Sequence, residues 1–241
     1  MDKPEVRRRG DAEETRRRVL DAAVATVVDV GYYKASSNEI ARRAGVTWGS
    51  IQHLFGSREQ LMLAVVNDLG TRLERQFAEG DVQGDTLEER LRCVLDVLAG
   101  HYERPAYLVQ VQILLDLSAN PRMSEQRRNA IRDQNGQVFD VLARPLLAKA
   151  LGDLVAEPDL VLYAFMTMRG YLVSCGITRM IAELPEGTVL RLMASDPDGP
   201  TDDSTIRELL VRGIAATLRE EAARRGYPVD AATTASVPAE R

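Results

Sequence analysis

The segment 40–46, which reads I-A-R-R-A-G-V, constrains the fold of this chain more than any other part of the sequence. Ala41 is small enough for a second helix to pack closely on it, and Gly45, four residues later, accepts a left-handed turn without steric cost. The apolar residues around the turn are spaced to fill the angle between two short helices: Ile40, Ala44, Val46, Ile51 and Leu54. The spacing predicts two helices that cross steeply, the helix-turn-helix arrangement.

The second helix of this pair keeps a polar outer face, made of Thr47, Trp48, Ser50, Gln52 and His53. An ordinary helical corner that ends in glycine is the alternative for the 40–46 segment taken alone. Capping signals on both sides favour the helix-turn-helix. Ser36 and Ser37 suit the start of the first helix, Thr47 suits the start of the second, and Ser57 with Gln60 matches a capping box.

The rest of the chain also reads as helices, so we predict an all-α fold. Beyond the short pair, helices are expected over 11–30, 58–79, 86–103, 106–118, 122–151, 158–182 and 204–225, with a kink at Pro145. Residues 183–204 read as a long loop. The predicted organisation is a flexible basic arm (1–10), a three-helix domain that contains the helix-turn-helix (11–57), a larger helical domain (58–225) and a disordered tail (226–241).

Charge is divided unevenly along the chain. The net charge is −5, but residues 1–62 carry 11 basic against 9 acidic residues, which leaves 20 basic and 27 acidic residues for the rest. A basic N-terminal segment (1–62, called the head below) and an acidic remainder weakly favour contact between the head and phosphate. The two cysteines, Cys93 and Cys175, form no close pair, so we expect neither a disulfide framework nor a metal site, and no cofactor.

We expect a cytoplasmic protein. The N-terminus lacks the apolar segment of a secretory signal. Residues 160–182 are long and apolar enough to suggest a membrane span, but Arg169 lies near their middle, at a cost of about 2.5–3.5 kcal/mol on insertion scales. A buried helix is the better interpretation.

No motif for catalysis is present: the sequence contains no G-x-S-x-G, P-loop, G-x-G-x-x-G or H-E-x-x-H, and only His53 and His101 as histidines. We therefore do not expect an enzyme. A helical adaptor that binds only proteins is a second alternative, against which the polar outer face at 47–53 argues.

Residues 19–61 resemble the DNA-binding domain of the TetR family of repressors. The matching segments are V-L-D-A-A at 19–23, G-Y at 31–32, A-S-S-N-E-I-A-R-R-A-G-V-T at 35–47, W-G-S-I at 48–51 and F-G-S-R-E-Q-L at 55–61. The resemblance implies that Ser36 and Ser37 cap the second helix near phosphate. It also implies that Thr47, Trp48, Gly49 and Ser50 begin the recognition helix in the major groove, and that Arg58 lies near phosphate.

The sequence departs from the family where Gln52 and Leu54 replace residues that are often aromatic or histidine. Gln52 could contact phosphate or read adenine, so its role is open. His53 could donate to DNA or simply face solvent. Lys34 is a further candidate for phosphate. The arginines at 7–9 could enter a minor groove as a flexible arm, or form a solvated charge run.

One short recognition helix reads few base pairs, so a homodimer on a pseudo-palindromic operator is expected. The predicted dimer surface is the last two helices, 158–182 and 204–225. The final helix has an apolar stripe, formed by Ile206, Leu209, Leu210, Gly213, Ile214 and Leu218, and the resemblance implies that the same two helices form a four-helix bundle.

We expect the protein to be a repressor that an unidentified small molecule releases from double-stranded DNA, with 58–79 as the lever. A ligand-independent regulator or an activator would have the same head. The middle helices offer candidate ligand contacts, each of which could instead be a packing or surface residue: His101, Tyr102, Tyr107, Gln110, Gln112, Tyr163, Met166 and Arg169. Arg169 needs a charged partner, which could be a carboxylate across the dimer or an anionic ligand.

Overall fold

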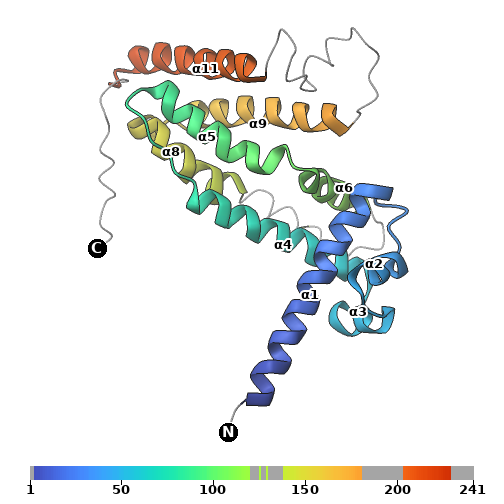
Figure 1. The fold of residues 1–241 in the computed structure, drawn as a ribbon. Coiled ribbons are helices and arrows are strands. Elements are labelled where there is room, and N and C mark those ends of the chain that lie inside the picture. Colours follow the sequence, from blue (N-terminus) through green and yellow to red (C-terminus); the bar gives the residue numbers. More distant parts are fainter. Residues whose placement is uncertain (1–2, 120–124, 126–128, 130–137, 181–202, 229–241) are drawn as a thin grey trace. The chain divides into compact units, whose positions relative to one another are not determined.

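The computed structural model describes residues 3–119, 125, 129, 138–180 and 203–228, and these contain helices and no strands (Figure 1). The elements are α1 (Lys3–Val30), α2 (Ser37–Ala44), α3 (Trp48–Phe55), α4 (Arg58–Glu79), α5 (Leu87–Tyr102), α6 (Pro105–Ala119), the π-helix η1 (Val138–Ala143), α8 (Arg144–Leu151), the 3₁₀ helix η2 (Gly152–Ala156), α9 (Pro158–Met180) and α11 (Asp203–Arg225).

Most predicted helix boundaries agree with the structure to within two residues, and α1 is the main exception. It begins at Lys3, eight residues before the predicted start, so the expected flexible arm is helical from Lys3 onward. Pro4 lies in the first turn, where its missing N–H costs no helical hydrogen bond. A helix about 10–12 Å wide is broader than the minor groove of about 6 Å, so in this form α1 does not fit the predicted minor-groove contact.

At the kink predicted at Pro145 the chain stays helical, but the type of helix changes. A π-helix ends at Ala143, and α8 begins at Arg144 with the proline in its first turn. Most of the predicted helix 122–151 before residue 138, most of the loop 183–204 and most of the tail from 226 lie outside the described residues.

The chain divides into two compact units that do not follow the predicted boundary at residue 57. The first unit comprises Met1–Leu73 and Pro105–Ile131, and the second comprises Glu74–Arg104 and Arg132–Arg241. The first unit therefore includes most of α4 and the whole of α6. Sequence order did not show this, because α6 follows a helix of the second unit.

The core of the first unit joins α1, α2, α3, α4 and α6. Fully or nearly fully buried side chains from each helix meet there: Val19, Ala23, Ile40, Ala44, Ile51, Leu61, Met62, Val65, Val109, Ile113 and Leu117. Arg16 of α1 also stacks on Phe55 at the end of α3, with its guanidinium carbon 4.7 Å from the ring centroid. These contacts fix the short helices α2 and α3, which are too short to be stable alone.

The second unit packs α5 against α8, α9 and α11. Its buried core is mostly aliphatic and includes Leu91, Leu95, Leu98, Leu146, Leu147, Val161, Leu172, Ile214 and Leu218. Within α9, Pro158–Thr178 is long and apolar enough to cross a membrane by length and composition, and 44% of its most apolar window is buried here. Such a helix is also typical of a soluble core, which is how α9 packs in this unit.

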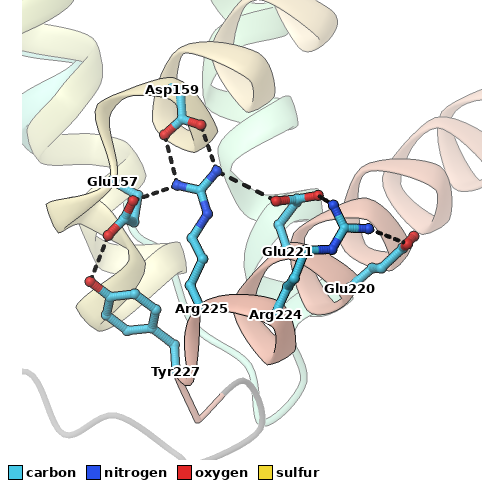
Figure 2. A network of polar contacts seen from close by, with 7 residues as sticks. All are labelled: Glu157, Asp159, Glu220, Glu221, Arg224, Arg225 and Tyr227. Carbon is cyan, nitrogen blue, oxygen red and sulfur yellow. Dashed lines mark hydrogen bonds and ion pairs between the residues drawn. The ribbon is translucent and has the colours of Figure 1, made fainter.

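A polar network fastens the C-terminal end of α11 to the start of α9 (Figure 2). Arg225 forms a bidentate ion pair with Asp159 (3.0 and 2.7 Å) and also contacts Glu157 and Glu221. The Tyr227 hydroxyl donates to Glu157 at 2.7 Å. These bonds lower the pKa of Glu157, chiefly through Tyr227 and then Arg225, and the bond from Arg225 lowers the pKa of Asp159. The network stabilises the antiparallel placement of α9 and α11.

Candidate nucleic-acid interface

Caps hold both ends of α2. The Ser36 hydroxyl accepts from the Glu39 N–H at 3.2 Å. Gly45 ends the helix with φ 67° and ψ 34°, the left-handed conformation that favours glycine. The next N–H, of Val46, donates to the Ala41 carbonyl at 3.0 Å. The predicted roles of Ser36 and Gly45 in the fold are thus confirmed.

Caps also set the direction of α3. The Thr47 hydroxyl accepts from the Ser50 N–H at 3.1 Å and lies 2.9 Å from the Ser50 hydroxyl. Gly56, with φ 81°, ends the helix. The Ser57 hydroxyl then accepts from the Gln60 N–H at 3.2 Å, which is the first half of the predicted capping box. The corner is therefore fixed by local bonds at every break in the chain.

The wedge between the two helices is apolar, as predicted. Ile40, Ala41, Ala44 and Ile51 are buried, and Val46 and Leu54 are partly buried against the same core. On the other side of α3, the exposed residues are Thr47, Gly49, Gln52 and His53, with Ser50 partly exposed. Trp48 departs from the expectation of a purely outward residue, because its large ring also packs against the core.

The basic residues of α2 are engaged in ion pairs. Glu39 pairs with Arg42 (2.7 Å) and Arg43 (2.7 Å), and Arg43 also contacts Asp29 of α1. Hydrogen bonds from Arg42 and then Arg43 lower the pKa of Glu39 to about 2. Arg43 therefore joins α2 to α1, whereas Arg42 pairs only within α2. Ser36 and Lys34 are exposed beside the start of α2, and Ser37 is partly buried.

Arg58 is placed differently from the expectation. Its guanidinium donates to the Tyr32 carbonyl at 2.8 Å, the Tyr32 hydroxyl at 3.3 Å and the Ala35 carbonyl at 3.4 Å, and it lies 4.5 Å above the Tyr32 ring. A guanidinium has five N–H donors, so these bonds occupy much of its capacity. The residue ties α4 to the turn before α2, and a phosphate contact stays a prediction.

Three of the predicted ligand residues meet in the second unit. The Arg169 guanidinium lies 5.4 Å from the Tyr102 ring centroid, and the rings of His101 and Tyr102 are 4.9 Å apart edge to face. Burial, followed by the charges of Arg104 and Arg169, lowers the pKa of His101 to about 4. Phe165 and Phe139 extend this aromatic cluster, and sequence reasoning missed both because no spacing links them to Tyr102.

The remaining candidates lie elsewhere. The Tyr163 hydroxyl donates to Thr217, joining α9 to α11 at 3.3 Å, and Met166 is 51% exposed on the outer face of α9. Tyr107, Gln110 and Gln112 belong to α6 of the first unit. Tyr107 is buried, Gln112 is partly buried, and the Gln110 side-chain oxygen is buried without a hydrogen-bond partner among the described residues.

A groove of about 580 Å³ lies between α5 and α11 of the second unit. Its lining is largely charged, with Arg92, Asp96, Arg207, Glu208 and Arg212, and none of the predicted ligand residues contributes to it. Two of its arginines are paired: Arg92 with Glu208 (2.6 Å), and Arg207 with Glu103 (2.5 Å) and Asp96 (3.6 Å). These ion pairs connect α11 to α5 across the groove.

Known proteins share both the head and the fold. Residues 19–65 match the family model described as "Bacterial regulatory proteins, tetR family". An uncharacterized HTH-type transcriptional regulator of Mycobacterium tuberculosis is 27% identical over 132 residues, 53% of this chain and 66% of the relative. The HTH-type transcriptional regulator BetI of Cronobacter sakazakii is 41% identical over 131 residues, 53% of this chain and 63% of the relative. The chain thus matches just under two thirds of the length of these relatives.

Solved structures show the same architecture at low sequence identity. A transcriptional regulator of Rhodococcus sp. Rha1 superposes with a TM-score of 0.56 at 15% identity, covering 84% of this chain and 96% of that one. A regulator of Streptomyces coelicolor superposes with a TM-score of 0.51 at 22% identity, covering 84% and 97%. The helix-turn-helix geometry and the family match agree that residues 19–65 form a DNA-binding domain of the TetR type, and the chain shares the fold of these solved regulators.

Proposed function

We propose that this protein is a transcription regulator that binds a specific double-stranded DNA sequence through α3. One observation carries the proposal: a corner fixed by caps on both helices presents a polar, exposed face at Thr47, Gly49, Gln52 and His53. A helix of this width fits the major groove, where each base pair presents a distinct hydrogen-bonding pattern. This polar outer face argues against the alternative of a protein-binding adaptor.

Residue roles follow from position on this corner. Ser36 and Ser37 lie at the start of α2, where helix N–H groups favour a phosphate, and Lys34 lies nearby. Ser50 and Gln52 are the candidates for reading base edges, with Trp48 and His53 beside them. Arg58 acts mainly from inside the head, through the carbonyls of Tyr32 and Ala35.

We propose that the protein acts as a homodimer through α9 and α11. Both helices expose an apolar strip in the single chain: Leu162, Met166 and Ile177 on α9, and Leu209, Gly213 and Ala216 on α11. Apolar surface of this kind is typical of an interface with another protein. Two copies related by a two-fold axis would present two α3 helices to a pseudo-palindrome.

We further propose that a small-molecule effector weakens this DNA binding, so that the protein works as a cytoplasmic repressor. The cluster of His101, Tyr102 and Arg169 supplies a cation, aromatic faces and a neutral imidazole in one place. An effector that binds best to a dimer with wrongly spaced heads must lower operator affinity by the same coupling energy.

The deciding experiment selects bound fragments from random double-stranded DNA and measures affinity for the enriched sequence across a salt series. We expect a pseudo-palindromic consensus and a steep fall of log affinity with log salt. Sedimentation at micromolar concentration should show a dimer. A protein with no salt-sensitive preference for any duplex would contradict DNA recognition, and a monomer would contradict the proposed assembly.

A further inference from the structure

Tyr33 lies in the turn between α1 and α2 and is the most exposed large apolar residue in the described part of the chain, at 87%. Its neighbour Tyr32 is buried, and the two rings meet edge to face with their centroids 5.6 Å apart. Within the residues that the structure describes, no hydrogen bond engages the Tyr33 hydroxyl. A lone exposed side chain is common on protein surfaces, so the surroundings of this one decide whether it has a role.

The turn that carries Tyr33 is held from inside the head. Arg58 donates from Nη2 to the Tyr32 carbonyl at 2.8 Å and from Nε to the Ala35 carbonyl at 3.4 Å, and its guanidinium lies 4.5 Å above the Tyr32 ring. The Ala35 N–H also donates to the Gly31 carbonyl at 3.1 Å. These bonds fix the turn on both sides of Tyr33, so little backbone freedom is lost when the turn binds a partner.

The same bonds place the turn beside the end of α3. Arg58 is the first residue of α4 and follows Gly56, the C-cap of α3, by two positions. The turn therefore lies within the reach of one arginine side chain from the end of the helix that is proposed to enter the major groove. It then continues into Ser36, the N-cap of α2. All of these residues belong to the segment Met1–Leu73 of the first unit.

The turn also offers a cation. Lys34 is exposed, and among the described residues no carboxylate pairs with its ammonium. The arginines of α2, Arg42 and Arg43, differ because Glu39 pairs with both of them. Lysine and tyrosine are among the side chains that bind the sugar–phosphate backbone of DNA. A fixed turn with an exposed phenol and an available ammonium therefore has the chemistry to bind the backbone of a duplex.

We propose that Tyr33 is a DNA-contacting residue: its hydroxyl donates to a backbone phosphate beside the groove that α3 enters, and Lys34 pairs with a phosphate there. The inference rests on the proposed function and extends the interface from the face of α3 to the α1–α2 turn. Arg58 takes part as a positioning residue that holds the turn. Because the contact is made to the backbone, it adds affinity for any duplex and no sequence preference.

The test measures the affinity of the full-length protein for the selected operator and for a scrambled duplex of the same length, across a salt series. Tyr33→Phe should weaken both by about threefold to tenfold, the effect of one hydrogen bond, and should leave the salt slope unchanged. Lys34→Ala should also weaken both and should reduce the slope by about one. The preferred sequence should stay the same in both variants.

Two matched controls accompany these changes. Tyr33→Ala should weaken binding at least as much as Tyr33→Phe, and its control is Leu115→Ala, at a 66% exposed apolar residue of the first unit. The control for Lys34→Ala is Lys149→Ala, which removes an exposed positive charge from the second unit. Both controls should bind like wild type. Because Tyr33 is exposed, its variants should keep the wild-type unfolding temperature. Unchanged affinity in Tyr33→Phe and Tyr33→Ala, or an altered sequence preference, would contradict the proposed contact.

Chemical modification gives a readout of the contact itself. Nitration of tyrosine rings, quantified for each site by mass spectrometry, should be fast at Tyr33 in the free protein and slow at operator saturation. Tyr227, whose hydroxyl is bonded to Glu157 in the second unit, should react alike in both states. A wild-type protein that prefers no duplex would contradict the proposed function. An operator-bound protein whose Tyr33 stays as reactive as in the free state would contradict this inference alone.

Discussion

The α2–α3 corner and the α9–α11 pair expose opposite chemistry. The corner buries its apolar residues, Ile40 and Ile51 among them, and leaves Thr47, Gln52 and His53 in solvent. The pair buries its own core but leaves Leu162, Met166 and Leu209 between 46% and 58% exposed. A polar face suits a hydrated, charged partner such as DNA, and an apolar face suits a second copy of the chain.

The two regions also differ in what holds them. The corner depends on contacts close in sequence, such as Ser36 with Glu39 and Thr47 with Ser50. The pair depends on contacts far apart in sequence, such as Arg225 with Asp159 (Figure 2). Local contacts make the boundaries of the corner predictable from the sequence, whereas the α9–α11 pair is specified by contacts throughout its unit.

The largest effect should follow from placing a charge on the apolar face. Gly213 lies on the exposed side of α11, and a side chain there would meet nothing within 4 Å in the single chain. Gly213→Arg should leave the monomer folded and favour its helix, but should block dimerisation. Loss of the second half-site should cost about a hundredfold or more in operator affinity. Sedimentation and gel shift would check this. Ala78→Arg, at an exposed position of α4, is the control. A Gly213→Arg variant that is still dimeric would show that the interface lies elsewhere.

The two regions also differ in the environment of their histidines: His53 is exposed on the corner, whereas His101 is buried in the second unit. Because burial lowers the pKa of His101 from 6.5 to about 4, the unfolded chain binds more protons than the folded one between these values. Stability should therefore fall as the pH drops from about 6.5 to 4, by about 3 kcal/mol in total. Denaturant unfolding of wild type and His101→Gln should show this dependence shrinking in the variant, with His53→Gln behaving as wild type.

Gly45 tests whether the corner depends on backbone conformation alone. At φ 67° it has no neighbour within 4 Å of a potential Cβ, so any cost of a side chain is conformational. Gly45→Val should destabilise the head by about 1–3 kcal/mol, and Gly45→Asn by less, since asparagine tolerates this region. Thermal unfolding gives the comparison, and equal losses for the two variants would point to a steric cause instead.

The smallest effect should come from Gly49, and it should be confined to DNA. An added Cβ would lie 3.7 Å from the Thr47 hydroxyl, an ordinary contact, so Gly49→Ala should keep or slightly raise stability. If α3 lies closely against the duplex, operator affinity should still fall by about tenfold, comparable to one mismatched base pair. Unchanged affinity would place this turn of the helix away from the DNA.

Sequence predicted the corner well because its determinants are adjacent residues with specific conformational preferences. Gly45 suits the left-handed turn that ends α2, and Ser36 and Thr47 suit the N-caps of α2 and α3. The spacing of the apolar residues indicates which side of each helix is buried. The inward bonding of Arg58 could not be predicted, because its partners, Tyr32 and Ala35, lie more than twenty residues earlier.

Long-range packing explains the other differences. Met166 was a candidate ligand contact because it lies in one of the middle helices, and only the positions of α5, α8 and α11 show that it is on the exposed side of α9. The inclusion of α6 in the first unit was hidden for the same reason. Helical periodicity identifies an apolar stripe but does not name the helix that covers it.

That placement of α6 affects how such proteins can be recombined. An N-terminal fragment that ended after α3 or α4 would lack Val109, Ile113 and Leu117, so part of its hydrophobic core would be exposed to solvent. A chimera that joins this helix-turn-helix unit to a different C-terminal domain must therefore carry two separate stretches of sequence, since the unit is formed by segments on either side of α5.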